Sequence, residues 1–345
     1  MSKKIVFKNQ GSSINPGGGV QNGTGLSSAI IRLGVDCGNG HFKTNGKSFP
    51  SAAKMGEMPK VARAEGMHEV KVGGTYWTVG SGEKFIRDDR YTDRRYKVCL
   101  LTAIAMEAKS RGITASNLIV DLCVGLPQDL HKNDDLIEDL KATLTGWGKT
   151  HVEVDNRIED GINANYTIEI RKVIVFVEGA VVLLSGETGR VLTLDIGEGT
   201  YNCLAWENGA IVADATEKLG AQSIFQLIKD QLYATTRKSF TASEIENYIV
   251  NDNYLLPVGE EGATIDMSEQ FGEWIDAAVN NIYTDICNTG KFNFNTIEKV
   301  QLLGGAAIFT KEYFESIPAL KGKVELVENA QFINSEIYEA VINNA

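Results

Sequence analysis

The stretch with the strongest chemical signal is VLTLDIGEGTYNCLAWE, residues 191–207. A strand-forming run ends at Asp195, two glycines bracket Glu198, and a second strand pattern follows from Thr200, which predicts a tight β-hairpin. A two-glycine turn lets backbone N–H groups point into one concavity, and such a concavity can hold phosphate oxygens. Because a carboxylate would repel bare phosphate, Asp195 favours a divalent cation or its water shell between the two.

A single Asp-x-Gly-x-Gly segment is a common hairpin turn, but in this chain the pattern occurs twice. In LGVDCGNGHFK, residues 33–43, Asp36 again follows a strand, Gly38 and Gly40 come next, and the resuming strand contains Lys43. The repeat of a whole strand, acid, glycine turn and strand indicates two similar halves that face one ligand. We therefore expect two phosphate-binding hairpins that hold one polyphosphate.

Glu178 lies between the two hairpins in the sequence. A strand is expected to end at Val175, and Glu178-Gly179-Ala180 is expected to open an apolar helix. An acidic side chain at a helix N-terminus is stabilised by the helix dipole, and it can also orient an attacking water near a γ-phosphate. Its position 17 residues before Asp195 favours the second role.

A third glycine motif follows a strand near the end of the chain. The strand Ile297–Leu303 runs into Gly304-Gly305-Ala306-Ala307 and then into a helix pattern. This arrangement places backbone N–H groups and a flat surface beside a ligand, although it is also a common tight turn from strand to helix.

The remaining elements alternate between strands and helices. A hairpin is expected at Val70–Gly80, a strand at Leu118–Val124 that Gly125-Leu126-Pro127 ends, and a capping box at Thr241 with Glu244. Further strands are expected at Val152–Val154, Tyr166–Val175 and Ala210–Asp214, and helices at Tyr91–Ala108, Asn133–Leu144, Ala221–Tyr233, Met267–Phe292 and Asn334–Val341. Helices must then cover both faces of the strands, so the predicted fold class is α/β.

Length and composition are consistent with two domains. The chain has 345 residues, of which 43% are hydrophobic, enough for two separate cores. We expect a leader at 1–29 that is flexible or contacts another subunit, a first domain at 30–180 that 325–345 rejoin, and a second domain at 181–324. The glycine-, serine- and asparagine-rich leader buries too little apolar surface to order itself.

Charge and cysteine usage exclude several function classes. The net charge of −11 disfavours direct nucleic-acid binding, although a partner could bind DNA. No apolar run approaches the roughly 18 residues that span a membrane, and the N-terminus lacks a signal-peptide core. The five cysteines are isolated and odd in number, as expected of reduced thiols in a cytoplasmic protein.

Together these motifs resemble those of a known superfamily. The segments Asp36 to Lys43, Glu178 to Ala180, Asp195 to Thr200 and Gly304 to Ala306 are similar to the phosphate 1, connect 1, phosphate 2 and adenosine motifs of the actin, chaperone and sugar-kinase ATPases. Phe49-Pro50-Ser51 and Val124-Gly125-Leu126-Pro127 resemble the ParM-type plasmid-segregation actins. The resemblance implies an actin-like ATPase fold, with two related domains and a nucleotide cleft between them.

The resemblance also implies roles for individual residues. Asp36 and Asp195 would hold hydrated Mg²⁺, Lys43 would touch the β-phosphate of ATP, and Glu178 would position the lytic water. Further nucleotide contacts are implied for Gly38, Asn39, Gly40, Gly197, Glu198, Gly199, Thr200, Gly304, Gly305 and Ala306, and for Glu217 and Lys218 beside the ribose or base. Glu198 stands where the family often has a smaller residue.

The function that the resemblance implies is an ATP-dependent filament. Subunits would add head to tail, hydrolysis would control turnover, and a DNA-binding adaptor would link the filament to plasmid DNA, without direct contact to nucleic acid or membrane. A cytoskeletal actin-like ATPase without a segregation role is an alternative. A sugar or acid kinase would need a polar acceptor site that the sequence does not show, and a chaperone-like ATPase would need a substrate domain after the short last helix.

Overall fold

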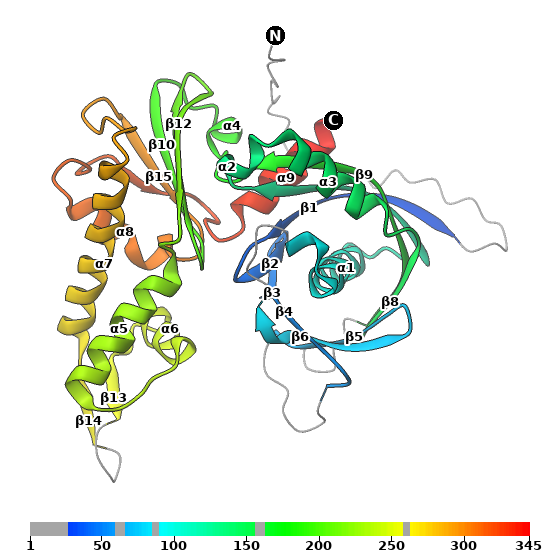
Figure 1. The fold of residues 1–345 in the computed structure, drawn as a ribbon, viewed down its shortest axis with the longest axis horizontal. Coiled ribbons are helices and arrows are strands. Elements are labelled where there is room, and N and C mark those ends of the chain that lie inside the picture. Colours follow the sequence, from blue (N-terminus) through cyan, green and yellow to red (C-terminus); the bar gives the residue numbers. More distant parts are fainter. Residues whose placement is uncertain (1–26, 59–65, 85–89, 156–162, 258–262) are drawn as a thin grey trace. The chain divides into compact units, whose positions relative to one another are not determined.

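The computed structural model describes residues 27–58, 66–84, 90–155, 163–257 and 263–345, which divide into two compact units (Figure 1). The first unit contains the described residues of Met1–Leu126, Leu130–Val177 and Asn334–Ala345, and the second contains those of Pro127–Asp129 and Glu178–Ile333. The chain thus returns to the first unit later than the expected residue 325. Residues 1–26 of the expected leader lie outside the described residues.

The first unit is built on one nine-stranded sheet with the order β3-β2-β1-β7-β9-β8-β5-β6-β4. Its strands are β1 (Ser28–Cys37), β2 (His41–Thr44), β3 (Lys47–Pro50), β4 (Ala52–Met55), β5 (His68–Val72), β6 (Thr75–Lys84), β7 (Asn117–Leu126), β8 (Thr150–Asp155) and β9 (Ala164–Val177). The helices that precede β9 or close the chain are η1 (Arg90–Thr92), α1 (Arg94–Ser110), α2 (Gln128–His131), α3 (Asp134–Thr145) and α9 (Ile333–Asn344).

The second unit has a five-stranded sheet with the order β12-β11-β10-β15-β16, and a separate two-stranded hairpin. Its strands are β10 (Arg190–Ile196), β11 (Tyr201–Glu207), β12 (Ala210–Glu217), β13 (Leu255–Pro257), β14 (Thr264–Asp266), β15 (Lys299–Leu303) and β16 (Val324–Leu326). Its helices are α4 (Val182–Ser185), α5 (Ala221–Thr236), α6 (Ala242–Val250), α7 (Ser268–Asn288) and α8 (Ala307–Ser316).

Five strands in each unit share one topology. In the first unit β3, β2 and β1 form an antiparallel meander, followed by β7 and β9 in parallel. In the second unit β12, β11 and β10 form the same meander, followed by β15 and β16 in parallel. Asp36 and Asp195 are each the second-last residue of the first strand. The α/β fold of two related halves, predicted from a short repeated motif, is therefore confirmed.

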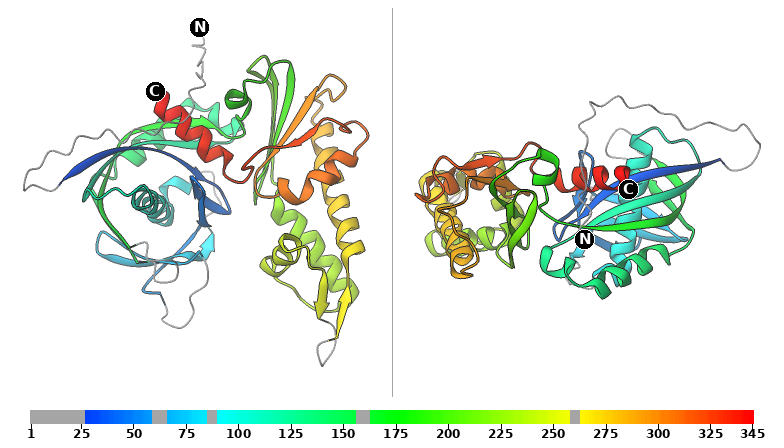
Figure 2. Two further views of the ribbon diagram at one scale, coloured as in Figure 1. Left: turned by 180° about the vertical axis from the view of Figure 1, so that it is seen from behind. Right: turned by 90° about the horizontal axis from the view of Figure 1, so that it is seen from above.

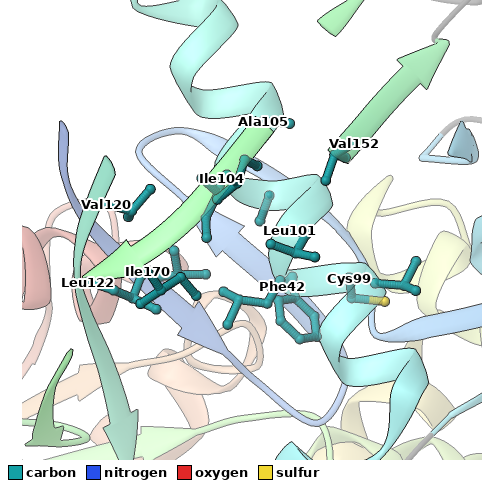
Figure 3. Close-up of a cluster of buried hydrophobic side chains, with 14 of the residues drawn as sticks. Phe42, Cys99, Leu101, Ile104, Ala105, Val120, Leu122, Val152 and Ile170 are labelled. Carbon is teal, nitrogen blue, oxygen red and sulfur yellow. The ribbon is translucent and has the colours of Figure 1, made fainter. Parts of the chain in front are cut away.

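The core of the first unit forms around α1. The sheet curls around this helix, as Figure 1 and the rear view in Figure 2 both show. Figure 3 shows Leu101 and Ile104 of α1 among Phe42, Leu122 and Ile170 from three different strands. A helix enclosed in this way is apolar around most of its circumference, which explains why the run of buried residues in α1 is nearly continuous.

Helix α9 packs on β1 and β7 at unusually short distance. A Cβ atom at Gly34 would lie 2.3 Å from the backbone oxygen of Ser335, and one at Gly125 would lie 1.8 Å from Tyr338 Oη. Only glycine therefore fits at these two strand positions. The strand expected to end at Val124 continues to Leu126 and ends before Pro127, and Gly125 admits the tyrosine ring.

Two predicted helices begin elsewhere in the structure. The helix expected from Tyr91 begins at Arg94, because Asp93 caps it by accepting a hydrogen bond from Arg95 N–H, and the residues before it form the turn η1. The helix expected to open at Glu178 is the single turn α4. Gly179 has a φ of 78°, which keeps Glu178 in a turn outside that helix.

In the second unit the predicted long helix and capping box are both present. Helix α7 buries Phe271, Ile275 and Val279 along one face, but ends at Asn288, before Gly290 with a φ of 66°. Thr241 and Glu244 bond reciprocally at the start of α6. Four of the five cysteines are buried free thiols, whereas Cys287 is exposed. Within the described residues, no helix is both long and apolar enough to cross a membrane.

Candidate functional site

The first hairpin pairs an acid with a base. Asp36 on β1 lies directly opposite Lys43 on β2 in the strand register. Lys43 Nζ donates to Asp36 Oδ2 at 3.3 Å, and both side chains are largely buried. The two residues predicted to meet a cation and a phosphate are thus brought together, and in this structure each is the other's partner.

The turn of the first hairpin is held by side chains from outside it. Ser51 Oγ donates to the carbonyl of Gly38 at 2.6 Å, and Ser51 N–H donates to the carbonyl of Gly40 at 2.7 Å. Asn39 Oδ1 accepts a hydrogen bond from the Arg90 guanidinium. Two turn carbonyls are therefore engaged within the unit, and the turn can offer a ligand its N–H donors. Arg90 was not identified from the sequence.

His41 begins β2, close to this turn. Burial, followed by the charges of Lys43 and Lys84, lowers the pKa of His41 from 6.5 to about 4. The imidazole is therefore neutral at neutral pH. The positive charges near this turn belong to Lys43 and to the Arg90 guanidinium, not to the histidine.

The second hairpin holds its aspartate against the third glycine motif. Asp195 is 5% exposed and lies in register with Asn202 on β11 and with Leu303 on β15. A Cβ at Gly304 would lie 2.5 Å from Asp195 Oδ1 and 2.5 Å from the carbonyl oxygen of Ile196. Gly304 also has a φ of 90°. A glycine is therefore required for this carboxylate to take its position.

The other residues of the third motif differ in their surroundings. Ala306 is 1% exposed, and its N–H donates to the carbonyl of Ile196 at 3.2 Å. No atom lies within 4 Å of a Cβ placed on Gly305. Ala306 therefore fastens the start of α8 to the hairpin, while Gly305 presents an open backbone surface.

The turn of the second hairpin is bonded to the helix that follows it. Gly197 N–H donates to the carbonyl of Thr200 at 3.0 Å, so this amide is not available to a ligand in this geometry. The carbonyls of Gly197 and Glu198 accept from the N–H groups of Ala221 and Gln222, at 2.9 and 2.8 Å. The turn thereby supplies the backbone caps that the first residues of α5 need.

Gly220, just before α5, packs against the same turn. A Cβ at this position would lie 2.5 Å from the carbonyl oxygen of Glu198, 2.6 Å from that of Gly197 and 2.6 Å from the amide nitrogen of Thr200. Glycine at this position was not assigned a role from sequence, because its contact arises only when β12 returns beside β11.

Glu178 is joined to the second hairpin by a chain of hydrogen bonds. Asn202 Nδ2 donates to Glu178 Oε2 at 2.9 Å, and Thr216 Oγ1 donates to Asn202 Oδ1 at 2.9 Å. A carboxylate only accepts hydrogen bonds, so this network fixes the orientation of the Asn202 amide. Asn202 is 4% exposed and lies opposite Asp195 in the hairpin. Asn202 is therefore hydrogen-bonded to Glu178, which is predicted to position the lytic water, and is paired in the hairpin with Asp195, which is predicted to hold hydrated Mg²⁺.

Glu217 and Lys218 lie at the end of β12 and are both exposed. Glu217 is in register with Tyr201, the first residue of β11. The structure thus places both residues near the hairpin turn. The neighbouring Thr216, which sequence reasoning passed over, carries the hydrogen bond to Asn202.

Each unit has one carboxylate of a kind that can take part in binding hydrated Mg²⁺. Asp36 in the first unit and Asp195 in the second are both largely buried, and Mg²⁺ is typically bound by one or two carboxylates and several waters. Among the described residues, no group of three or more His, Cys, Asp or Glu side chains forms a complete metal site. A cation bound at either carboxylate would keep most of its water ligands.

Comparison with known proteins agrees with this geometry. Residues 34–180 match the family model described as the N-terminal domain of actin-like proteins. The apo structure of the psk41 ParM protein superposes with a TM-score of 0.62 at 17% identity, covering 91% of this chain and 97% of that one. The chain has the actin-like fold.

Other solved structures with the actin-like fold are equally similar. A 15-stranded ParM filament from Clostridium botulinum gives a TM-score of 0.68 at 15% identity, over 91% of this chain and 99% of that chain. An archaeal actin homologue in complex with ADP gives 0.67 at 15% identity, over 91% of this chain and 100% of that chain. No curated protein matches the sequence.

Proposed function

We propose that this actin-like protein binds Mg²⁺-ATP and assembles into filaments whose turnover is controlled by ATP hydrolysis. The proposal rests on the duplicated meander. In each unit its first strand ends with a buried aspartate, Asp36 or Asp195, just before a glycine turn. The filament and the ADP complex of other proteins with this fold support the proposal of filament assembly and nucleotide binding.

The residues divide the work of binding. Asp36 and Asp195 would hold hydrated Mg²⁺ through water, and the cation would supply positive charge against the phosphates. Lys43 exchanges its contact with Asp36 for one with the β-phosphate, since one ammonium can serve both anions in turn. The remaining nucleotide contacts are assigned to Gly38, Asn39, Gly40, Gly197, Glu198, Gly199 and Thr200 for the phosphates, to Gly304, Gly305 and Ala306 for the adenosine, and to Glu217 and Lys218 for the ribose or base.

Of the two glycines of the third motif, Gly305 is better placed than Gly304 to meet a ligand. Gly304 packs against the Asp195 carboxylate, and the N–H of Gly197 donates to the carbonyl of Thr200. Gly305, by contrast, has open space beside it. The flat surface expected to meet the adenosine is therefore that of Gly305.

Glu178 positions the water that attacks the γ-phosphate. A general base or water-positioning group must be held in a fixed orientation to act, because small misplacements cost much of the rate. Asn202 supplies this constraint through its bond to Glu178 Oε2, and Thr216 fixes Asn202 in turn. Glu178 is thus the catalytic residue and Asn202 a positioning residue.

Assembly would follow from a head-to-tail contact, which does not close on itself and so grows a filament. In the cell we assign this filament the segregation of plasmid DNA through a DNA-binding adaptor. An actin-like filament with another cytoskeletal task is the alternative, and a pull-down of DNA-bound adaptor from the native host separates the two.

The proposal is tested by light scattering and phosphate release with ATP and Mg²⁺. We expect scattering that depends on ATP, and hydrolysis per subunit that rises with protein concentration. Glu178→Ala should bind ATP and form long-lived filaments, while Glu312→Gln, an exposed carboxylate on α8, should behave as wild type. Hydrolysis per subunit that is independent of concentration would remove the coupling to assembly, and normal hydrolysis by Glu178→Ala would remove Glu178 from the mechanism.

A further inference from the structure

A cavity in the first unit shares no residue with the hairpins. It has a volume of about 440 Å³ and lies where the β5–β6 turn, the start of α1 and the start of β8 meet. Volumes of roughly 300–1,000 Å³ are usual for small-molecule sites. Its wall contains the apolar Val72 and Val98 and the ring of Trp77.

The charge of this cavity is opposite to that of the chain. Its charged and titratable lining residues are Arg94, Lys97, Lys149 and His151, and none of its lining residues is acidic. The whole chain carries a net charge of −11. A cluster of cations in so acidic a protein concentrates anions locally. We call this cavity the basic pocket.

Arg94 and Lys97 form the part of the basic pocket that lacks acidic partners. The Arg94 guanidinium lies 5.4 Å from the centre of the Trp77 ring, and its hydrogen bond is to Thr75 Oγ1 at 3.4 Å. Lys97 Nζ lies 5.2 Å from the centre of the Trp147 ring. Within the described residues neither cation has a carboxylate within ion-pair distance.

The position of these two cations is unfavourable for the folded chain. Both lie in the first turns of α1, where the helix dipole favours negative charge, and they are three residues apart, so they face the same side and repel each other. Burial, followed by the charge of Arg94, lowers the pKa of Lys97. An anion placed between them would remove each of these costs.

The other two basic residues, Lys149 and His151, lie at the rim of the basic pocket and already have partners. Lys149 is 3.9 Å from Glu169, and His151 Nε2 is 3.2 Å from Glu153 Oε1. They are therefore less available to a ligand than Arg94 and Lys97. The rim adds positive potential, while the two unpaired cations define the binding position.

We propose that the basic pocket binds a small molecule that carries a phosphate monoester. A phosphate monoester has a charge of about −1.5 to −2 at neutral pH, which matches the two unpaired cations, whereas one carboxylate would neutralise only one of them. The guanidinium can bind phosphate through two parallel hydrogen bonds. The volume exceeds that of phosphate alone, and the apolar wall accommodates the carbon part of the ligand.

The test is calorimetric titration of the full chain with glycerol phosphate, with acetate as the single-charge comparison. We expect glycerol phosphate to bind the wild type and to bind the Arg94→Ala/Lys97→Met variant about 100-fold more weakly, roughly 10-fold for each cation. Lys109→Ala removes a cation from the exposed last turn of the same helix and should bind as the wild type does. Equal affinity for acetate, or unchanged binding in the double variant, would overturn the proposal.

Two further measurements separate this site from the hairpins and from a structural role. Asp36→Ala/Asp195→Ala should lose ATP binding and keep glycerol phosphate binding; loss of both would place the anion at the hairpins. Lys97→Met without ligand should unfold at the same or a higher temperature than the wild type, because it removes a repulsion. A markedly lower unfolding temperature would show that Lys97 serves the fold through Trp147 instead.

Discussion

Lys43 Nζ and Asp36 Oδ2 lie 3.3 Å apart, on directly paired residues of β1 and β2. Removing the ammonium leaves the largely buried carboxylate without its cation, and such losses cost about 3–5 kcal/mol when the partner is buried. We expect Lys43→Met to lower the free energy of unfolding in urea by roughly this amount. Lys43→Met/Asp36→Asn should recover most of it. Equal stability of wild type and Lys43→Met would show that this ion pair does not stabilise the fold.

The two neighbouring glycines Gly304 and Gly305 offer a matched comparison. Alanine at Gly304 would place Cβ 2.5 Å from Asp195 Oδ1 and adopt a φ of 90°, whereas alanine at Gly305 meets no atom within 4 Å. We expect Gly304→Ala to be destabilising by about 2 kcal/mol or more and to weaken Mg²⁺-ATP binding through the displaced carboxylate. Gly305→Ala should keep its stability. Equal unfolding temperatures and equal nucleotide affinities of the two variants would contradict this prediction.

Asn202 can be tested as a residue that acts through Glu178. Asn202→Ala removes the 2.9 Å hydrogen bond to Glu178 Oε2, so the carboxylate that we propose positions the water loses its constraint. We expect ATP affinity to change little and the rate of hydrolysis to fall roughly 10- to 100-fold.

Thr216→Val is the graded control for that experiment, because it removes only the outer hydrogen bond to Asn202. Its rate should lie between those of the wild type and Asn202→Ala. A parallel loss of ATP affinity in Asn202→Ala would instead indicate that the amide shapes the binding site.

Buried histidine makes the stability depend on pH. Burial, followed by the charge of Lys47, lowers the pKa of His68 from 6.5 to about 4. Between these values the unfolded chain binds a proton that the folded chain does not, so stability is full above pH 6.5 and is lost as the pH falls toward 4. The loss from His68 amounts to about 3 kcal/mol.

His68→Phe, which retains an aromatic ring beside Phe49, should show a smaller loss of unfolding free energy between about pH 7 and about pH 5 than the wild type. Equal pH dependence would contradict this assignment.

The sequence predicted the strands and turns around both aspartates because the signals are local. Asp36 and Asp195 each follow a β-branched, apolar run and precede paired glycines, and such patterns depend on few distant contacts. The shared topology of the two units follows from the same repeat. Local patterns could not show where each element ends. Gly125 lies inside β7 because its missing side chain leaves room for Tyr338 of the last helix, and that contact is not visible in the local sequence.

The unpredicted part of the candidate site consists of residues that act through tertiary register. Asn202 is a polar residue on a largely apolar strand. Its place opposite Asp195 in the expected hairpin was the signal that could have indicated a role in the site. Thr216, Gly220 and Arg90 acquire their partners only after distant segments meet. Their types and neighbours in sequence carry no indication of those contacts.

The carbonyls of Gly197 and Glu198 hold the first residues of α5, and Gly220 leaves no space between the two. Any displacement of the glycine turn must carry the helix with it. Sixteen residues of α-helix span about 24 Å. A displacement of the turn would therefore also move the far end of α5, near the exposed ring of Tyr233. The second unit thus has a rigid connection from the glycine turn of its hairpin to the far end of α5.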